Sequence, residues 1–207
     1  VYGLKPQYVL GNELVYRYNN ASLFWGGNEY LFFENKDVRA TNLNIQYIDL
    51  QEIYHSYLYT NVDRSAKKYT FNPDINGGFM VTVLDRDDPN IEADYTHVHF
   101  SLLRSELLNA SVYVYGGFNN FATTAENRMA YNSKKGIYET SILMKQGFYN
   151  YKYVVVDKDN VLLEGEISGN FDVTENNYKV VAYYREIGAR YDRLIGLGEA
   201  NSVEMTN

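Results

Sequence analysis

The chain of 207 residues contains no cysteine, which excludes disulfide bonds, thiol catalysis and thiolate metal sites. It also lacks a run of about 20 apolar residues, the length that a helix needs to cross a bilayer, so we expect no membrane-spanning segment. The opening VYGLKPQYVL has neither a basic head nor a long apolar stretch, and we expect that no signal peptide is present in this chain. The formal net charge of −7 argues against nucleic acid as a partner.

Sequence motifs of catalysis are absent as well. The chain has no Gly-x-Ser-x-Gly elbow, no phosphate-binding glycine loop and no dinucleotide fingerprint. None of its acidic residues stands in the apolar or glycine-rich setting expected of a hydrolytic carboxylate pair. Glu164 and Glu166 alternate with Gly165, as on an exposed strand. We therefore expect that the protein is not an enzyme and binds no cofactor.

Two polar clusters have the residue types of a metal site without a complete ligand set. His97 and His99 share one face of a predicted strand, a spacing that can chelate zinc, but His55 is far away in the sequence and no third ligand adjoins the pair. The acidic segment DRDDPN, residues 85–90, lacks the central glycine and the closing glutamate of a calcium loop. We expect surface or cross-strand histidines, a solvated acidic linker and no metal site.

The residues that are abundant point to β-structure. Tyrosine, with 22 copies, favours strands and is also enriched at contact surfaces. Most segments alternate with a period of two, as do Leu14, Tyr16 and Tyr18 against their neighbours, whereas the best helical candidate is the short segment 102–109. The pattern predicts an all-β protein.

A domain boundary is predicted in the segment DRDDPNIEAD, residues 85–94, where a charge cluster and Pro89 separate two strand-like runs. After this segment, short strands recur at the spacing typical of a β-sandwich of about 100 residues. The prediction is therefore two β-sandwich-like domains. The first is a β domain over residues 1–90. The second is an immunoglobulin-like β-sandwich with a C-terminal tail over residues 91–207.

The stretches VYVYGGFNNF, GFYNYKYVVVD and NNYKVVAY resemble the glycogen-binding modules of branching enzymes and of AMP-activated kinase β subunits. This resemblance implies an immunoglobulin-like sandwich on which sugar stacks on two tryptophans beside a lysine and an asparagine. Carried over to this chain, the glycan face would consist of Phe121, Lys152 and Asn177. Phe121 stands where the first tryptophan would be and the second has no counterpart, so the stacking surface is smaller. A carbohydrate-binding module is the alternative function.

A second resemblance covers the whole chain, to the C-terminal half of the plug proteins of the type IX secretion system. The matching motifs are FWGGNEYLFFENKD, DINGGFMV, EADYTHVHFSL, GGFNNF, KQGFYNYKYV, TENNYKVVAYYR and GARYDRLIG. The family implies a non-enzymatic, secreted periplasmic protein that closes the periplasmic opening of a very large outer-membrane translocation barrel. Family members also carry a signal peptide and a further N-terminal β domain, so a chain that opens on Val1 would be a fragment. Leu31 and Glu34 replace the arginine and aspartate that usually follow the family's Asn-Glu pair.

A plug needs a rigid body with a broad contact surface and no chemistry. The aromatic segments 118–121 and 149–151 are candidates for part of that contact area, and the alternative for each of these aromatic residues is core or cross-strand packing. The partner predicted by the resemblance is therefore an outer-membrane translocon barrel, with a glycan as the alternative.

Cationic and aromatic residues near the end of the chain form the predicted partner contact, because arginine and tyrosine are frequent interface anchors. These residues are Arg185, Arg190, Tyr191 and Arg193. The alternative is an intramolecular tail, in which Arg190 and Arg193 pair with acids while Leu194 and Ile195 cover an open sheet edge.

Overall fold

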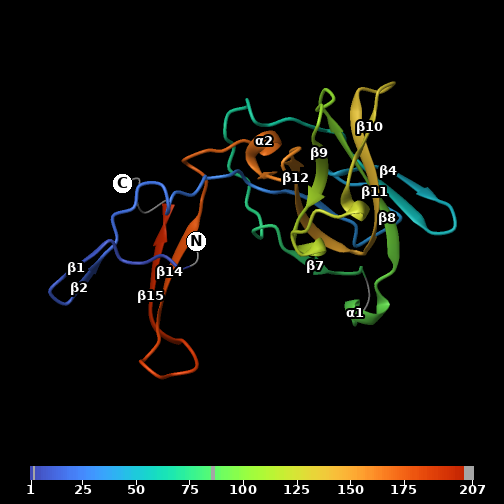
Figure 1. Ribbon diagram of the computed structural model, residues 1–207. Helices are drawn as coiled ribbons and strands as arrows, with labels where there is room; N and C mark the ends of the chain where they lie inside the picture. Colours follow the sequence, from blue (N-terminus) through green and yellow to red (C-terminus); the bar gives the residue numbers. More distant parts are fainter. Residues whose placement is uncertain (2, 85–86, 203–207) are drawn as a thin grey trace.

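The computed structural model describes residues 1, 3–84 and 87–202, and most of its regular structure is β-strand (Figure 1). This confirms the predicted all-β class. No helix in the described ranges is long and apolar enough to cross a membrane. The elements in chain order are β1 (Tyr8–Leu10), β2 (Glu13–Val15), β3 (Leu31–Glu34), β4 (Ile45–Leu50), β5 (Tyr54–Leu58), β6 (Asn61–Val62), β7 (Phe79–Val81), α1 (Pro89–Glu92), β8 (Tyr95–Leu103), β9 (Ser111–Tyr115), η1 (Gly117–Asn119), η2 (Ala125–Asn127), β10 (Ala130–Asn132), β11 (Ile137–Lys145), β12 (Gly147–Val156), β13 (Leu162–Leu163), α2 (Gly165–Ser168), β14 (Asn177–Tyr184) and β15 (Arg193–Asn201).

Two sheets share one core. In the first, the strand order is β10-β11-β8-β5-β4, with β6 also paired to β8. In the second, the long strand β12 pairs with β3, β7, β9 and β13. Two further hairpins, β1–β2 and β14–β15, make strand pairs only within themselves among the described residues.

Alternation along β8 builds one side of the core. Its even-numbered residues from Thr96 to Leu102 are buried, whereas the residues between them face outward. Aromatic rings then join the two sheets. Phe33 of β3 stacks on Tyr149 of β12 at 5.1 Å between ring centroids, and it meets Phe100 of β8 edge-on at 5.8 Å.

The predicted division between residues 90 and 91 is wrong. β3 and β7 precede this point and pair with β12, which follows it, and β5 pairs in parallel with β8. Each sheet therefore contains strands from both predicted domains. Part of the 85–94 segment instead forms a short helical turn, because Asp88 accepts a hydrogen bond from the backbone N–H of Asn90 at 3.0 Å and caps α1. Asp85 and Arg86 lie outside the described residues.

Of the two alternatives for residues 149–151, contact area is wrong and core packing is confirmed for Tyr149 and Tyr151. Tyr149, Tyr151 and Tyr153 are each only 2 % exposed and belong to the core. The hydroxyls of Tyr151 and Tyr153 donate to Asn61 Oδ1 at 2.9 and 2.7 Å, so these buried polar groups are satisfied. The segment 102–109, the best helical candidate in the sequence, forms no helix, because β8 runs to Leu103 and a loop follows.

Candidate protein-binding surface

The β14–β15 hairpin extends away from the sandwich, with its connecting loop at the far end (Figure 1). Its register runs from Asn177 opposite Asn201 to Tyr184 opposite Arg193, and it shifts once, between Ala182 and Tyr183. The β-branched and aromatic residues of β14 favour an extended strand. Because an isolated two-stranded hairpin is only marginally stable in water, this projection needs support from elsewhere.

Hydrogen bonds from side chains at the base of the hairpin to the carbonyl oxygens of Gly26 and Gly27 attach the hairpin to the rest of the chain. The side-chain amide of Asn176 donates to the carbonyl oxygen of Gly26 at 2.8 Å, and the Thr174 hydroxyl donates to that of Gly27 at 3.0 Å. A Cβ atom on Gly26 would lie 1.9 Å from the carbonyl oxygen of Phe171, so the two backbones touch where only glycine fits.

Two of the predicted contact residues are engaged within the hairpin loop. Arg185 binds Asp192 with two hydrogen bonds, Nε to Oδ1 at 2.8 Å and Nη2 to Oδ2 at 2.9 Å. These bonds hold the pKa of the Asp192 carboxyl below its usual value. Arg193 pairs with Glu186 at 3.1 Å. All four side chains are exposed, so the pairs shape the loop more than they stabilise it.

The other two predicted residues, Arg190 and Tyr191, lie exposed in the loop. The alternative in which Leu194 and Ile195 cover an open sheet edge is wrong. Both side chains are exposed, and in the described part of the chain β15 pairs only with β14. The exposed surface of the β14–β15 hairpin therefore includes Leu194 and Ile195 in addition to the four predicted residues.

One face of the hairpin carries a row of large apolar side chains. Val181 lies opposite Leu197, and Tyr183 lies opposite Leu194. All four side chains are exposed. Contiguous apolar patches on a protein surface mark sites of interaction with another macromolecule.

The opposite face is shallow, because Val180 lies opposite Gly198 and Ala182 opposite Gly196. Sequence reasoning missed this arrangement, since it treated β14 as the closing strand of a sandwich. The available signal was the run VVAYY, which places apolar residues on both faces of one strand. The second hairpin, β1–β2, lies on the same side of the sandwich in Figure 1 and exposes further apolar residues.

The three residues of the alternative glycan face do not form one surface. Lys152 of β12 is 8 % exposed, and its Nζ lies 2.5 Å from Glu164 Oε2. Asn177 belongs to the hairpin, where its Oδ1 accepts a hydrogen bond from Asn201 at 2.7 Å. Phe121 is half-exposed at the edge of the sandwich.

Aromatic rings enclose Lys152. Its Nζ lies 4.9 Å from the centroid of Tyr30 and 5.7 Å from that of Tyr115. Phe121 packs on Tyr115 at 5.5 Å, in a left-handed backbone conformation with φ of 54°. A Cβ on Gly77 would come within 3 Å of both the Tyr30 and Phe121 rings, so this turn fills the space between them. Lys152 is therefore engaged within the protein rather than presented to a sugar.

Replacing Lys152 by methionine is expected to change the free energy of unfolding by no more than about 1 kcal/mol, because an apolar chain of similar volume can occupy the site while Glu164 turns to water. Lys152→Ala is expected to cost about 2 kcal/mol, through the lost packing of the side-chain stem. Urea unfolding followed by circular dichroism measures both. Equal losses in the two variants would show that the charge, and not the stem, is what stabilises β12.

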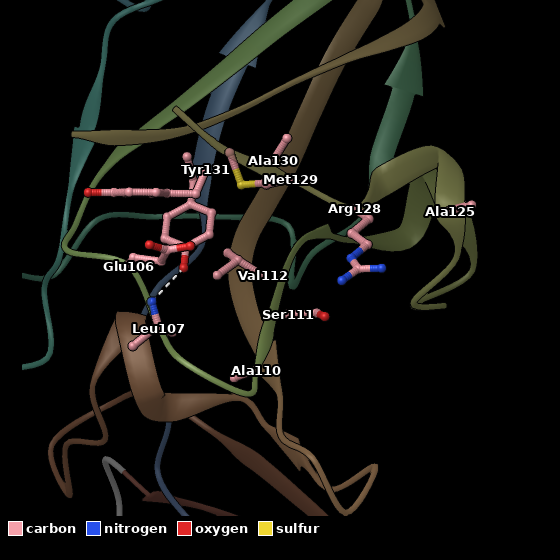
Figure 2. Close-up of a pocket in the computed structure, with 11 residues that line it drawn as sticks. Glu106, Leu107, Ala110, Ser111, Val112, Ala125, Arg128, Met129, Ala130 and Tyr131 are labelled. Atoms are coloured by element: carbon pink, nitrogen blue, oxygen red, sulfur yellow. Dashed lines mark hydrogen bonds between the residues drawn. The ribbon is translucent and has the colours of Figure 1, made fainter. Parts of the chain in front are cut away.

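A pocket of about 380 Å³ opens at one edge of the sandwich (Figure 2). Val112 and Met129 form its apolar floor, and the Leu107 backbone N–H donates to the Tyr138 hydroxyl at 2.7 Å. Glu106 and Arg128 lie on opposite sides of it in Figure 2. The pocket thus combines an apolar floor with two separated charges.

The described histidines and acids do not assemble a metal centre. His97 and His99 lie on one face of β8, as the spacing predicts. Among the residues that the structure describes, no three side chains of histidine, aspartate or glutamate are placed to hold a metal ion.

No protein-family model and no curated protein matches the chain. It is similar to the crystal structure of a hypothetical protein from Parabacteroides merdae ATCC 43184, with a TM-score of 0.86 and 36 % sequence identity over 96 % of the chain. The chain spans 50 % of that protein's length. This similarity supports the all-β fold with several sheets.

Proposed function

We propose that this chain is a non-catalytic, protein-binding part of a periplasmic plug that closes an outer-membrane protein translocon. The observation that carries the proposal is the β14–β15 hairpin, which projects from the sandwich with large apolar side chains exposed. The resemblance of motifs along the whole chain to the plug proteins of the type IX secretion system supplies the identity of the partner. The hairpin also carries exposed arginine and tyrosine side chains, which are residue types enriched in protein-binding surfaces.

Protein binding is favoured over carbohydrate binding by the state of Lys152. A lysine that binds sugar must offer its Nζ to hydroxyl groups, whereas this Nζ is buried against Glu164 and two tyrosine rings. The hairpin has the opposite character, since its apolar side chains have no partner surface among the described strands. Burial of such side chains against another protein would remove apolar surface from water and so favour a complex.

The test is capture from solubilised outer membranes of the source organism, with this chain as bait and mass spectrometry as the readout. The wild-type chain is expected to retain a giant outer-membrane β-barrel protein. Leu197→Glu, which places a charge in the apolar row, is expected to reduce that recovery about tenfold, corresponding to about 1.4 kcal/mol. Leu197 is 61 % exposed, so the substitution leaves the core intact.

Leu43→Glu provides the matched control, because Leu43 is 93 % exposed and lies outside both hairpins. It should capture the barrel as well as the wild type does. If both variants retain the barrel equally, the hairpin is not the contact. If the wild type recovers polysaccharide or no barrel protein, the plug function itself is contradicted.

A further inference from the structure

All three histidines of the protein lie in one cluster on the outer face of the first sheet. β5 pairs in parallel with β8, which places His55 opposite His97 and Tyr57 opposite His99. The ring centroid of His55 lies 4.9 Å from that of His97 and 5.1 Å from that of His99. The fold thus completes a group of which the sequence shows only two members.

A direct contact joins two of the rings. His55 Nδ1 lies 2.8 Å from His99 Nε2, which is the distance of a hydrogen bond. Such a bond needs a proton on one nitrogen and a free lone pair on the other. If both rings were protonated, two N–H groups would point at each other and two positive charges would meet. The contact also occupies a lone pair that a metal ion would need.

The groups around the cluster come from three neighbouring strands. Asp49 of β4 lies opposite His55, and on β11 Ser141 lies opposite His99, with its Oγ 3.4 Å from His97 Nδ1. Tyr57 stacks on His99 with 4.0 Å between centroids.

Two carboxylates, Asp49 of β4 and Glu139 of β11, lie on the strands beside the cluster. Glu139 interacts with the His99 charge from β11, but it is also paired with Lys135 at 3.1 Å. Lys145, a cation on β11, has its Nζ 5.6 Å from the centroid of the Tyr95 ring. Burial, and then the charges of His55 and His97, lower the pKa of His99 to about 4, and Glu139 only partly opposes them.

The strand pair that carries the cluster contains polar as well as apolar side chains on its inner face. Its parallel register joins Tyr54 to Thr96 and Ser56 to Val98, so that buried polar residues lie in the seam. Ser56 and Thr96 are both fully buried; the Thr96 hydroxyl donates to the carbonyl oxygen of Tyr54 at 2.7 Å, and the Ser56 hydroxyl lies 3.4 Å from it, at the limit of a hydrogen bond. Parallel pairing is moreover slightly less stable per residue than antiparallel pairing.

We propose that His55, His97 and His99 form a proton-binding cluster whose protonation weakens the pairing of β5 with β8, so that the β4–β5 hairpin loosens from the sandwich in mildly acidic solution. Among the described strands β4 pairs only with β5, so the pairing of β5 with β8 is the one strand contact that joins this hairpin to the sheet, beside the core packing of Ile45 and Leu58. Near neutral pH the hydrogen bond between His55 and His99 and the stacking of Tyr57 on His99 hold β5 against β8.

The direction of the pH effect follows from proton binding. His99 in an unfolded chain has a pKa of about 6.5, and in the folded protein the value is about 4. Between these values the unfolded state binds more protons, so stability is lost as the pH falls from about 6.5 toward 4.

The experiment measures the melting temperature of the chain between pH 7.5 and pH 5, in a metal-free buffer with chelator. The wild type is expected to lose about 3 °C more than His99→Phe, which keeps a ring against Tyr57 but does not titrate. His97→Asn is the matched control, because it retains the His55–His99 hydrogen bond and should keep most of the pH dependence. Backbone amides of β5 should also exchange faster than those of β12 at pH 5, after correction for intrinsic rates.

An imidazole NMR titration of the wild type tests the same proposal without relying on a variant. His99 is expected to titrate well below the ordinary pKa of about 6.5 for a histidine. The proposal is overturned if all three titrate near 6.5, or if wild type and His99→Phe lose the same melting temperature. It is also overturned if zinc added at pH 7.5 raises the melting temperature of the wild type but not of His99→Phe, because the rings would then separate to bind metal.

Discussion

Phe33→Ala is expected to lower the free energy of unfolding by about 4 kcal/mol. Phe33 is completely buried between the two sheets, stacked on Tyr149 and edge-on to Phe100. Alanine would remove these aromatic contacts and leave a cavity that the strands on either side cannot close. Urea denaturation followed by far-ultraviolet circular dichroism measures the change, and the denaturation midpoint should move to a lower urea concentration.

The adjacent residue provides the control, since Phe32 points to the opposite face of β3. It is only partly buried and stacks on Phe148 at 5.5 Å. Phe32→Ala is therefore expected to cost about 1 kcal/mol, several times less than Phe33→Ala. Similar losses for the two variants would contradict the assignment of Phe33 to a core shared by both sheets.

Local patterns in the sequence predicted the strands because side-chain alternation is a property of a few neighbouring residues. β8 shows this most clearly, with Val98, Phe100 and Leu102 buried and the residues between them facing outward. The burial of β12 could not be predicted in the same way. Both of its faces are buried, so Tyr149 and Tyr151 carried the same sequence signal as exposed aromatic residues.

Strand pairing was beyond the reach of the sequence because it depends on contacts between distant residues. The charged segment 85–94 has the composition of a linker, yet β5 on one side of it pairs with β8 on the other. The same non-local register brings His55 to His97. The sequence placed the predicted partner contact on residues that lie in the hairpin after residue 176, but it showed neither that this hairpin lies outside the two sheets nor that Lys152 is enclosed.

The second large effect is expected for Gly147→Ala, at about 3 kcal/mol of lost stability. A Cβ at this position would lie 2.4 Å from the carbonyl oxygen of Met80 and 3.0 Å from the Tyr149 ring. The Gly147 N–H donates to Asn35 Oδ1 at 2.8 Å, and its carbonyl accepts from the Asn35 N–H at 2.9 Å. Moving the backbone to admit the methyl group would disturb both bonds to a fully buried asparagine. Thermal and urea unfolding give the magnitude.

Gly198→Ala separates this steric effect from the general cost of replacing glycine. Gly198 lies in the exposed β15 strand, and a Cβ atom added to it would meet no other atom of the described residues within 4 Å. Its replacement is expected to change stability by less than about 0.5 kcal/mol. If Gly147→Ala were equally mild, β7 would have to move away from β12 without loss, and the pairing of Gly147 with Val81 would not be part of the cooperative fold. A loss confined to Gly147→Ala would show that β7, from before residue 90, is bound into the same folding unit as β12.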